Sequence, residues 1–228
     1  MKEGRLAILY FAYRPEKEAI RKPLLPEFGH DVNVHIYKML QSRVSDIMQP
    51  TGLPVFHVDD TMQKGNGFGE RLCNAAESIF KKGFDRLIIL GNDAYGLKPK
   101  HLNKAIEQVR AGNSCLLPSE LGGALMIGME KSQYNRAHWL ELPWCTEKLF
   151  NELFDCLSSC KLIDKALPEL NSKVDIHELL IMKGELTELA AYLLAVLETS
   201  FNENHAYPPF HEDPLAENLR FRGPPFMA

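Results

Sequence analysis

The sequence predicts an α/β fold built on parallel strands, and two observations carry this prediction. Residues Leu87 to Leu90 form a continuous apolar run bounded by Gly91. A strand without polar alternation is typical of a sheet that is covered on both faces, as parallel sheets are. Helical patterns flank the run on both sides, and strands that alternate with helices are typical of α/β proteins.

The first part of the chain is expected to begin with a strand over Arg5–Ala12, a short apolar run. Residues 14–26 are rich in proline and charge, and we predict a loop there. Apolar residues at helical spacing then predict a helix that begins near Asp31 and ends before Pro50. A second strand is expected over residues 53–58.

A glycine-rich turn at residues 65–69 opens the next predicted helix, and Gly83 ends it as a C-cap. Two short apolar runs farther along predict strands of the same sheet with a tight turn between them. The elements after Leu90 are expected in this order: a helix through Leu102 and Val109, strands at 115–117 and 124–129, a helix capped by Thr146, and an amphipathic helix from Leu186 to Leu197.

We assign residues 1–201 to one domain and residues 202–228 to a proline-rich C-terminal extension. The extension holds five prolines and no hydrophobic periodicity, so it is either an irregular tail or an arm that binds a partner subunit. An arm of this kind would make the chain a homo-oligomer.

Composition places the chain among ordinary globular proteins. Its 228 residues are enough for one large α/β domain or two small ones, and 45% are hydrophobic while 25% are charged. No apolar run approaches the ~20 residues of a membrane-spanning helix, and a net charge of −4 gives no electrostatic reason to expect nucleic acid binding. The five cysteines form no paired pattern, so we expect reduced thiols and a cytoplasmic location.

Asp93 follows the Leu87–Leu90 strand, separated from it by Gly91 and Asn92. In open α/β sheets, ligands bind just beyond the carboxyl ends of the strands. A carboxylate there suits a hard divalent cation that holds the phosphates of a nucleotide. The alternative is that Asp93 caps the following helix or makes a turn.

Three motifs occur in a fixed order, namely Gln63–Leu72 (QKGNGFGERL), Gly91–Leu97 (GNDAYGL) and Pro118–Gly128 (PSELGGALMIG). Together they resemble one family, the bacterial glycosyltransferase-A-like (GT-A-like) proteins of unknown function that are described as nucleotide-diphospho-sugar transferases. The order and spacing of the motifs are more specific than any one of them. The resemblance extends over residues 5–180.

This resemblance implies a three-layer α/β/α sandwich with a mostly parallel central sheet. It also implies that Asp93 is the counterpart of a metal-binding acid, with Mg²⁺ or Mn²⁺ as the cofactor. A nucleotide sugar or nucleoside diphosphate would lie over the first strand and the loop that follows it.

The sequence departs from the family at three charged positions. Pro23 stands where the family has an arginine, and Gly67 and Leu121 stand where it has acids. One remaining carboxylate holds Mg²⁺ only weakly unless the nucleotide supplies further oxygens.

The candidate site residues fall into three groups by their chemistry. Cationic and polar side chains would hold phosphates, glycines would let a sugar approach the backbone, and carboxylates would deprotonate an acceptor hydroxyl. For each charged residue, a solvated surface position is the alternative. The candidates are Arg21, Lys22, Arg71, Asn92, Gly122 and Gly123 for the cofactor, Asp93 for the metal, and Glu120, Asp59 and Asp60 for the base.

These residues are compatible with three alternative functions. The leading one is metal-assisted transfer of a sugar from a nucleoside diphosphate donor. The second is a catalytically degenerate GT-A-fold protein with a binding or regulatory role, because two expected acids and an arginine are replaced. The third is nucleotidyl transfer, in which the attack is at phosphorus; it normally requires a richer cationic loop.

Overall fold

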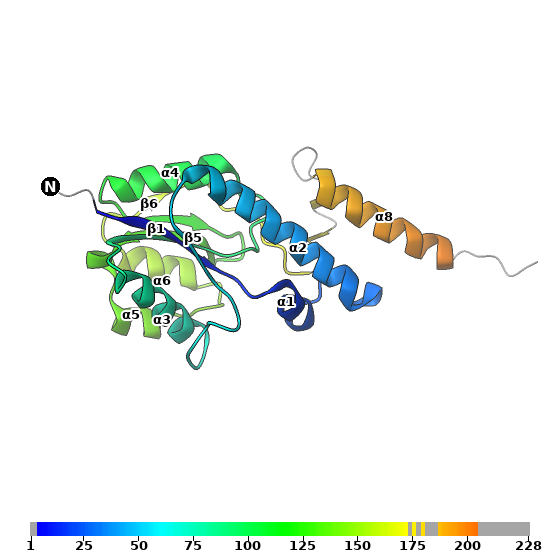
Figure 1. Ribbon diagram of the computed structural model, residues 1–228, viewed down its shortest axis with the longest axis horizontal. Coiled ribbons are helices and arrows are strands. Elements are labelled where there is room, and N and C mark those ends of the chain that lie inside the picture. The colour runs from blue at the N-terminus through cyan, green and yellow to red at the C-terminus, as the bar shows by residue number, and fades with distance from the viewer. Residues whose placement is uncertain (1–3, 173–174, 177–178, 181–186, 205–228) are drawn as a thin grey trace, which may run out of the picture.

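The computed structural model describes residues 4–172, 175–176, 179–180 and 187–204. A six-stranded sheet lies between layers of helices, which confirms the predicted three-layer α/β/α sandwich (Figure 1). The strand order is β2-β1-β3-β5-β4-β6. The strands are β1 (Leu6–Phe11), β2 (Val55–Val58), β3 (Arg86–Leu90), β4 (Cys115–Pro118), β5 (Ala124–Glu130) and β6 (Lys161–Leu162).

The sheet is mostly parallel, as predicted, and β5 is the strand that runs against the others. β1 pairs in parallel with β2 and β3, β4 pairs in parallel with β6, and β5 is antiparallel to β3 and β4. Leu90 at the end of β3 pairs with Met126 near the start of β5. The turn that precedes β5 therefore returns the chain to the edge where β1 and β3 end.

Two hydrophobic layers hold the helices to the sheet because alternate strand residues point to opposite faces. On β1, Ile8 and Tyr10 pack with α2 and α4, whereas Leu9 and Phe11 pack with the other helical layer. Figure 1 shows this division of the helices. The helices of the two layers are α2 (Gly29–Met48) and α4 (Pro99–Arg110) on one face, and α3 (Phe68–Phe80), α5 (Arg136–Glu141) and α6 (Leu149–Cys156) on the other.

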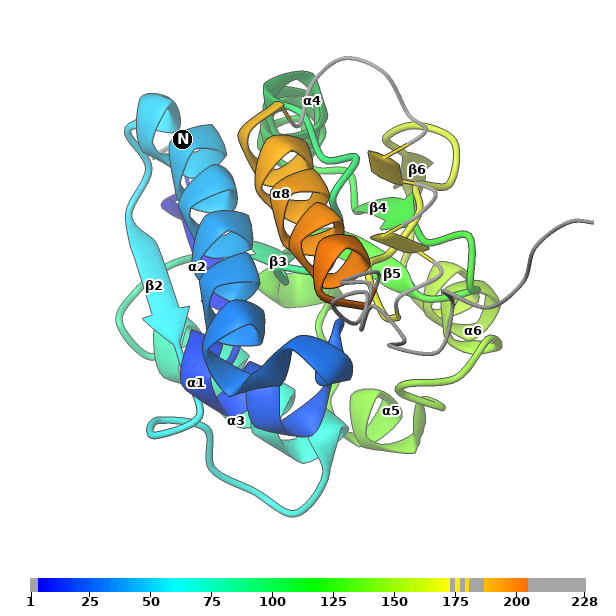
Figure 2. The same cartoon turned by 90° about the vertical axis from the view of Figure 1, so that its right-hand side faces the viewer.

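A third hydrophobic cluster joins α1 (Pro15–Arg21), the first half of α2 and the C-terminal helix α8 (Thr187–Asn204). Figure 2 shows α8 lying beside α2, and the rings of His35 and Tyr192 are 4.5 Å apart between these two helices. α8 is helical three residues past the predicted domain boundary at residue 201. The rest of the extension lies outside the described residues, so the two-part division and the oligomerisation arm stay predictions.

Two helices occupy segments for which the sequence predicts none. α1 lies inside the predicted loop at residues 14–26, where Pro15 takes the first helical position and Arg14 before it is extended, the arrangement in which proline favours a helix start. α5 begins after Asn135, whose side chain accepts a hydrogen bond from the His138 N–H. The predicted cap of α6, Thr146, lies two residues before Lys148, which is the N-cap residue.

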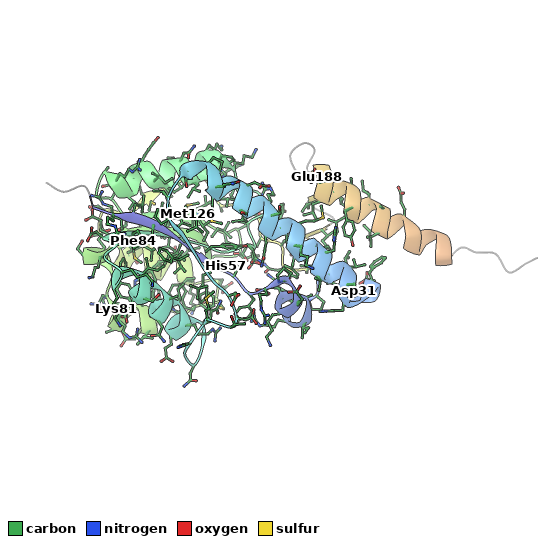
Figure 3. The ribbon with its side chains drawn as sticks, in the orientation of Figure 1. Asp31, His57, Lys81, Phe84, Met126 and Glu188 are labelled. Atoms are coloured by element: carbon green, nitrogen blue, oxygen red, sulfur yellow. The ribbon has the colours of Figure 1, made fainter. Side chains whose placement is uncertain are left out.

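Side chains fill the space between the sheet and its helices (Figure 3). Met126 and Phe84 are buried, whereas Lys81 at the end of α3 and Asp31 in the first turn of α2 are exposed. None of the helices in the described ranges combines the length and the apolarity that crossing a bilayer requires. All five cysteines are free thiols; the cytoplasmic location stays a prediction.

Candidate functional site

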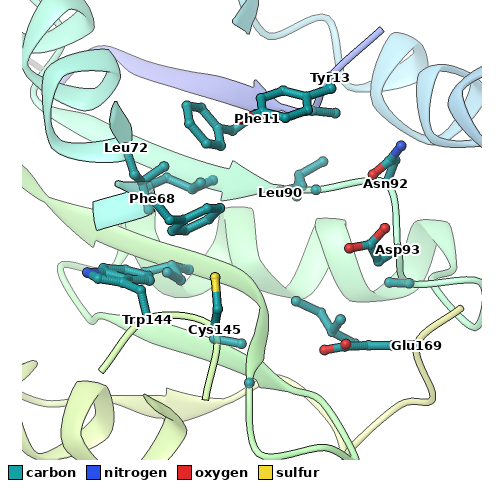
Figure 4. Close-up of a pocket in the computed structure, with 18 of the residues that line it drawn as sticks. Phe11, Tyr13, Phe68, Leu72, Leu90, Asn92, Asp93, Trp144, Cys145 and Glu169 are labelled. Carbon is teal, nitrogen blue, oxygen red and sulfur yellow. The ribbon is translucent and has the colours of Figure 1, made fainter. Parts of the chain in front are cut away.

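A cavity of about 450 Å³ opens at the edge of the sheet where β1 and β3 end. Figure 4 shows carboxylates on one side of it and aromatic rings with Cys145 on the other. The carboxyl edge of an open α/β sheet is the usual place for a ligand. The lining comes from the end of β1, from α1, from the start of α3, from the loop after β3, from the start of β5, and from the segments near residues 145 and 169.

A chain of polar contacts crosses the floor of the cavity. The ammonium of Lys22 donates to Asp93 Oδ1 at 3.0 Å and to Asn171 Oδ1 at 3.1 Å. The amide of Asn171 in turn donates to Glu169 Oε2 at 2.9 Å. The Lys22 ammonium and the Asn171 amide thus link the carboxylates of Asp93 and Glu169. The side chains of Lys22 and Asp93 are 26% and 39% exposed, so a ligand can reach both of them.

The backbone around these side chains is fixed by hydrogen bonds between distant segments. Lys22 is the C-cap residue of α1, and its carbonyl accepts the Tyr37 hydroxyl of α2 at 2.7 Å. The Leu170 N–H donates to the Asp93 carbonyl at 3.0 Å, and the Leu167 N–H donates to the Pro118 carbonyl at 3.0 Å. The segment that carries Glu169 is thereby held against the loop after β3 and the end of β4.

Two further cations line the cavity. The Arg21 guanidinium lies 4.6 Å from the ring centroid of Tyr13 and 3.9 Å from a Glu18 carboxylate oxygen. Arg71, in the first turn of α3, donates to the Gln63 side chain at 3.3 Å. Together with Lys22, they give this small volume three positively charged side chains that reach it from two different helices.

Glu18 is a buried carboxylic acid on the wall of the cavity. Burial raises the pKa of its carboxyl, and the negative charge of Asp93 raises it further. The pKa of the Tyr10 hydroxyl is raised in the same way, by burial first and then by Asp93. On this side of the cavity, burial and the charge of Asp93 both disfavour the ionised form of Glu18, whereas the charges of Lys22 and Arg21 favour it.

The opposite wall is aromatic. The ring centroids of Phe11 and Phe68 are 5.6 Å apart and those of Phe68 and Trp144 are 5.5 Å apart. The Trp144 indole N–H donates to the Trp139 carbonyl at 2.6 Å, which fixes the plane of the ring. An apolar wall opposite a charged floor suits a ligand with a ring at one end and charge at the other.

Asn92 and Asp93 occupy the turn after β3, as the sequence predicts. Asn92 is buried, and its side-chain amide nitrogen has no hydrogen-bond partner among the described residues. A buried amide without a partner costs free energy. Asn92 lines the cavity, so a ligand oxygen would satisfy this donor.

The donor set does not fit a metal ion that the protein holds by itself. Within the described ranges, no three His, Cys, Asp or Glu side chains are grouped closely enough to bind one. Asp93, the predicted ligand, faces the Lys22 ammonium at 3.0 Å. Mg²⁺ is usually held by one or two carboxylates together with substrate phosphates and water, and the one carboxylate predicted for this role already pairs with an ammonium.

The structure brings together most of the predicted cofactor residues but none of the predicted bases. Glu120 is exposed and outside the cavity. Asp60 accepts two hydrogen bonds from the Arg14 guanidinium, and Asp59 accepts from Thr61. The predicted residues that line the cavity are Arg21, Lys22, Arg71, Asn92, Asp93 and Gly123; those that do not are Asp59, Asp60, Glu120 and Gly122.

Gly122 lies outside the cavity, at a close approach of two backbone segments. Its φ is +80°, and its Cα faces the backbone of Glu147. The Gly122 carbonyl accepts the Phe150 N–H at 2.9 Å. Gly123, by contrast, borders the cavity beside Glu169, so the second glycine of the pair is the one that would let a ligand approach.

Glu18 and Glu169 are not among the site residues that the sequence predicts. Glu18 lies in the first turn of α1. The sequence pattern that could have placed it is Pro15 followed by acidic residues, which is typical of a helix start. Glu169 follows Leu167-Pro168 in a segment without regular structure, and no local pattern indicates that it folds back to the sheet.

Comparisons with known proteins agree with this architecture. Residues 41–146 match the model of a family of uncharacterized proteins conserved in bacteria, DUF2064. This range includes the three motifs at 63–72, 91–97 and 118–128, so the predicted resemblance is confirmed. No curated protein matches the chain.

Among solved structures, the chain is similar to the crystal structure of a "putative nucleotide-diphospho-sugar transferase" from Desulfovibrio desulfuricans G20. The TM-score is 0.71 at 16% sequence identity, over 87% of this chain and 98% of that chain. A more distant match is a CMP:2-keto-3-deoxy-manno-octonic acid synthetase in complex with CTP, with a TM-score of 0.40 and 14% identity over 77% and 96% of the two chains. The first likeness establishes the fold, and the second is too distant to carry an argument.

Proposed function

We propose that the chain binds a nucleoside diphosphate in this cavity and transfers a sugar from a nucleotide-sugar donor. The observation that carries the proposal is the convergence of Arg21, Lys22 and Arg71 on a cavity at the carboxyl edge of the sheet. A diphosphate is the ligand group that needs several cations in one place. The likeness in fold to a nucleotide-diphospho-sugar transferase supports the same choice.

In the proposed reaction, an acceptor hydroxyl attacks the anomeric carbon of the donor sugar. The bond between that carbon and the diphosphate oxygen breaks, and the nucleoside diphosphate leaves with the electron pair. The three cationic side chains would stabilise the charge that develops on the leaving group. For an inverting transfer, Glu169 would accept the proton of the hydroxyl, because it is a cavity carboxylate that Asn171 holds in place.

The first experiment is thermal unfolding of the protein with a panel of nucleoside diphosphates and nucleotide sugars, with and without Mn²⁺. A ligand at one hundred times its Kd stabilises the native state by about 2.7 kcal/mol. We expect a rise in Tm with one base, and none with the corresponding nucleoside, which has no phosphates. A panel that produces no shift would contradict the proposal.

A pair of variants tests whether the ligand that raises Tm binds in the cavity. Arg71→Ala removes a cation that lines it, whereas Lys64→Ala removes an exposed cation from the neighbouring loop. We expect the first variant to lower the ligand-induced shift in Tm and the second to leave it unchanged. Equal shifts for both variants would place the ligand elsewhere.

The second candidate is a protein that binds a nucleoside diphosphate without turnover. The position of Asp59, Asp60 and Glu120 outside the cavity favours it, because none of the bases that the sequence predicts lies where it would contact a bound acceptor. Product analysis separates the two functions: release of a nucleoside diphosphate from the stabilising donor indicates transfer or hydrolysis. Stabilisation without any release indicates a binding protein.

A further inference from the structure

The cation nearest Asp93 is a side chain of the protein. The Lys22 ammonium lies 3.0 Å from Asp93 Oδ1 and 3.1 Å from Asn171 Oδ1, so two oxygen acceptors from different parts of the chain hold it. Its backbone is also fixed, through the Tyr37 hydroxyl and the cap of α1. The positive charge therefore has a defined place on the floor of the cavity.

A divalent cation at Asp93 would compete with this ammonium for the same carboxylate. The two positive charges would repel each other across a short distance in a partly buried place, and no group of three His, Cys, Asp or Glu side chains among the described residues offers a metal ion another set of ligands. The local charges thus favour the ammonium over a metal ion.

We propose that Lys22 takes the place of the metal ion, so that the cavity binds a nucleoside diphosphate without a divalent cation. This inference rests on the proposed function and specifies its chemistry. The diphosphate oxygens would accept hydrogen bonds from the Lys22 ammonium, while Arg21 and Arg71 approach the same cavity from α1 and α3. Three side-chain charges then supply the neutralisation that a metal ion otherwise provides.

Asp93 has the opposite role in this arrangement from that of a metal ligand. It holds Lys22 in position when the cavity is empty, and it becomes a like charge beside the diphosphate when a nucleotide binds. Removing the charge of Asp93 should therefore release the ammonium to the ligand and tighten binding. For a metal ligand, the same substitution should abolish binding. The sign of the Asp93→Asn effect distinguishes the two mechanisms.

The test measures the Kd of the nucleoside diphosphate that stabilises the protein most, by isothermal titration calorimetry, in EDTA and in Mn²⁺. For the wild-type protein, we expect the same Kd in both solutions. Lys22→Met should raise the Kd in EDTA by about 10- to 100-fold, the loss that corresponds to one hydrogen bond between charged groups. Lys22→Arg, which keeps the charge, should restore most of the affinity.

Lys17→Met is the matched control, because Lys17 is an exposed lysine of the same helix that does not line the cavity. It should leave the Kd unchanged. Thermal unfolding of each variant without ligand checks that the fold is intact, and Asp93→Asn serves as the second test if Lys22→Met does not fold.

The Kd values of the wild type and the variants distinguish the inference from the proposed function. Binding in EDTA that Lys22→Met weakens and Asp93→Asn strengthens supports the inference. Binding that needs Mn²⁺, or that Asp93→Asn abolishes, overturns the inference and leaves the proposed function standing. Absence of binding by the wild-type protein in either solution overturns the proposed function, and the inference with it.

Discussion

A β-carbon on Gly122 would clash with the carbonyl oxygen of Glu147. Because φ of Gly122 is +80°, Gly122→Ala would add a strained backbone conformation, of order 1–3 kcal/mol, to the clash. Overpacking of this kind costs a further ~1–3 kcal/mol. We expect a large fall in the free energy of unfolding, measured by urea denaturation.

Gly123→Ala is the natural comparison, because a β-carbon there would lie 3.2 Å from Glu169 Oε1 and φ is not positive. We expect this variant to unfold at nearly the wild-type urea concentration and to bind nucleoside diphosphate more weakly. If both glycine variants were equally unstable, the division between a packing glycine and a cavity glycine would be wrong.

Glu169→Gln tests the proposed base. The amide keeps the size of the side chain but does not accept a proton, so we expect kcat for sugar transfer to fall by about 10²- to 10⁴-fold. The Kd of the nucleoside diphosphate should change little, because the cations remain. Glu120→Gln, which alters an exposed carboxylate outside the cavity, should leave both quantities at the wild-type value.

Glu18→Gln tests the buried acid through pH. Burial and the charge of Asp93 raise the pKa of Glu18 above the ordinary glutamate value. The folded state therefore binds this proton more tightly than the unfolded state does. The resulting stability is fully present below the ordinary pKa of about 4.3 and is lost as pH rises through the raised pKa.

A glutamine at position 18 is neutral at every pH, so its folded state does not include the free-energy cost of ionising a buried acid. We expect the urea midpoint of Glu18→Gln to exceed that of the wild type at about pH 8 and to converge with it at about pH 4. Glu16→Gln alters an exposed acid on the same helix and should show no such gain. A gain for Glu18→Gln that is independent of pH would contradict the assignment.

Asp60→Asn tests whether this acid has a structural role. Asp60 accepts hydrogen bonds from the Arg14 backbone and guanidinium, and the guanidinium holds the pKa of its carboxyl well below the usual range. We expect a lower Tm, because the contact anchors the start of α1, and an unchanged sugar-transfer rate once Tm is accounted for. A loss of kcat at unchanged Tm would return Asp60 to the candidate bases.

The sheet and the helices that pack on it could be predicted from the sequence because their signals are local. The apolar run at Leu87–Leu90, the glycine turn before α3 and the apolar spacing of α2 all match elements of the structure. The sequence predicts no helix at α1 because the prolines and charges of residues 14–26 also favour a loop, although Pro15 followed by acids favours a helix start. In such a segment, tertiary packing of Ala19 and its neighbours decides the outcome.

The site was harder to predict because its contacts are not local. Asp93 and Asn92 could be placed because they follow a strand directly. The position of Glu169 depends on the Leu170 and Leu167 backbone hydrogen bonds to segments that are distant in sequence. Nothing near residue 169 in the chain indicates these partners, so the choice among carboxylates fell on Asp59, Asp60 and Glu120.

The Lys22 ammonium joins Asp93 and Asn171, which lie 71 and 149 residues farther along the chain. Closing loops of this length costs conformational entropy that only a nearly complete fold repays. During refolding, the helices, whose contacts are local, should therefore form before the cavity does. A nucleotide added to refolding protein would report the last step, and its binding signal should lag behind the recovery of circular dichroism.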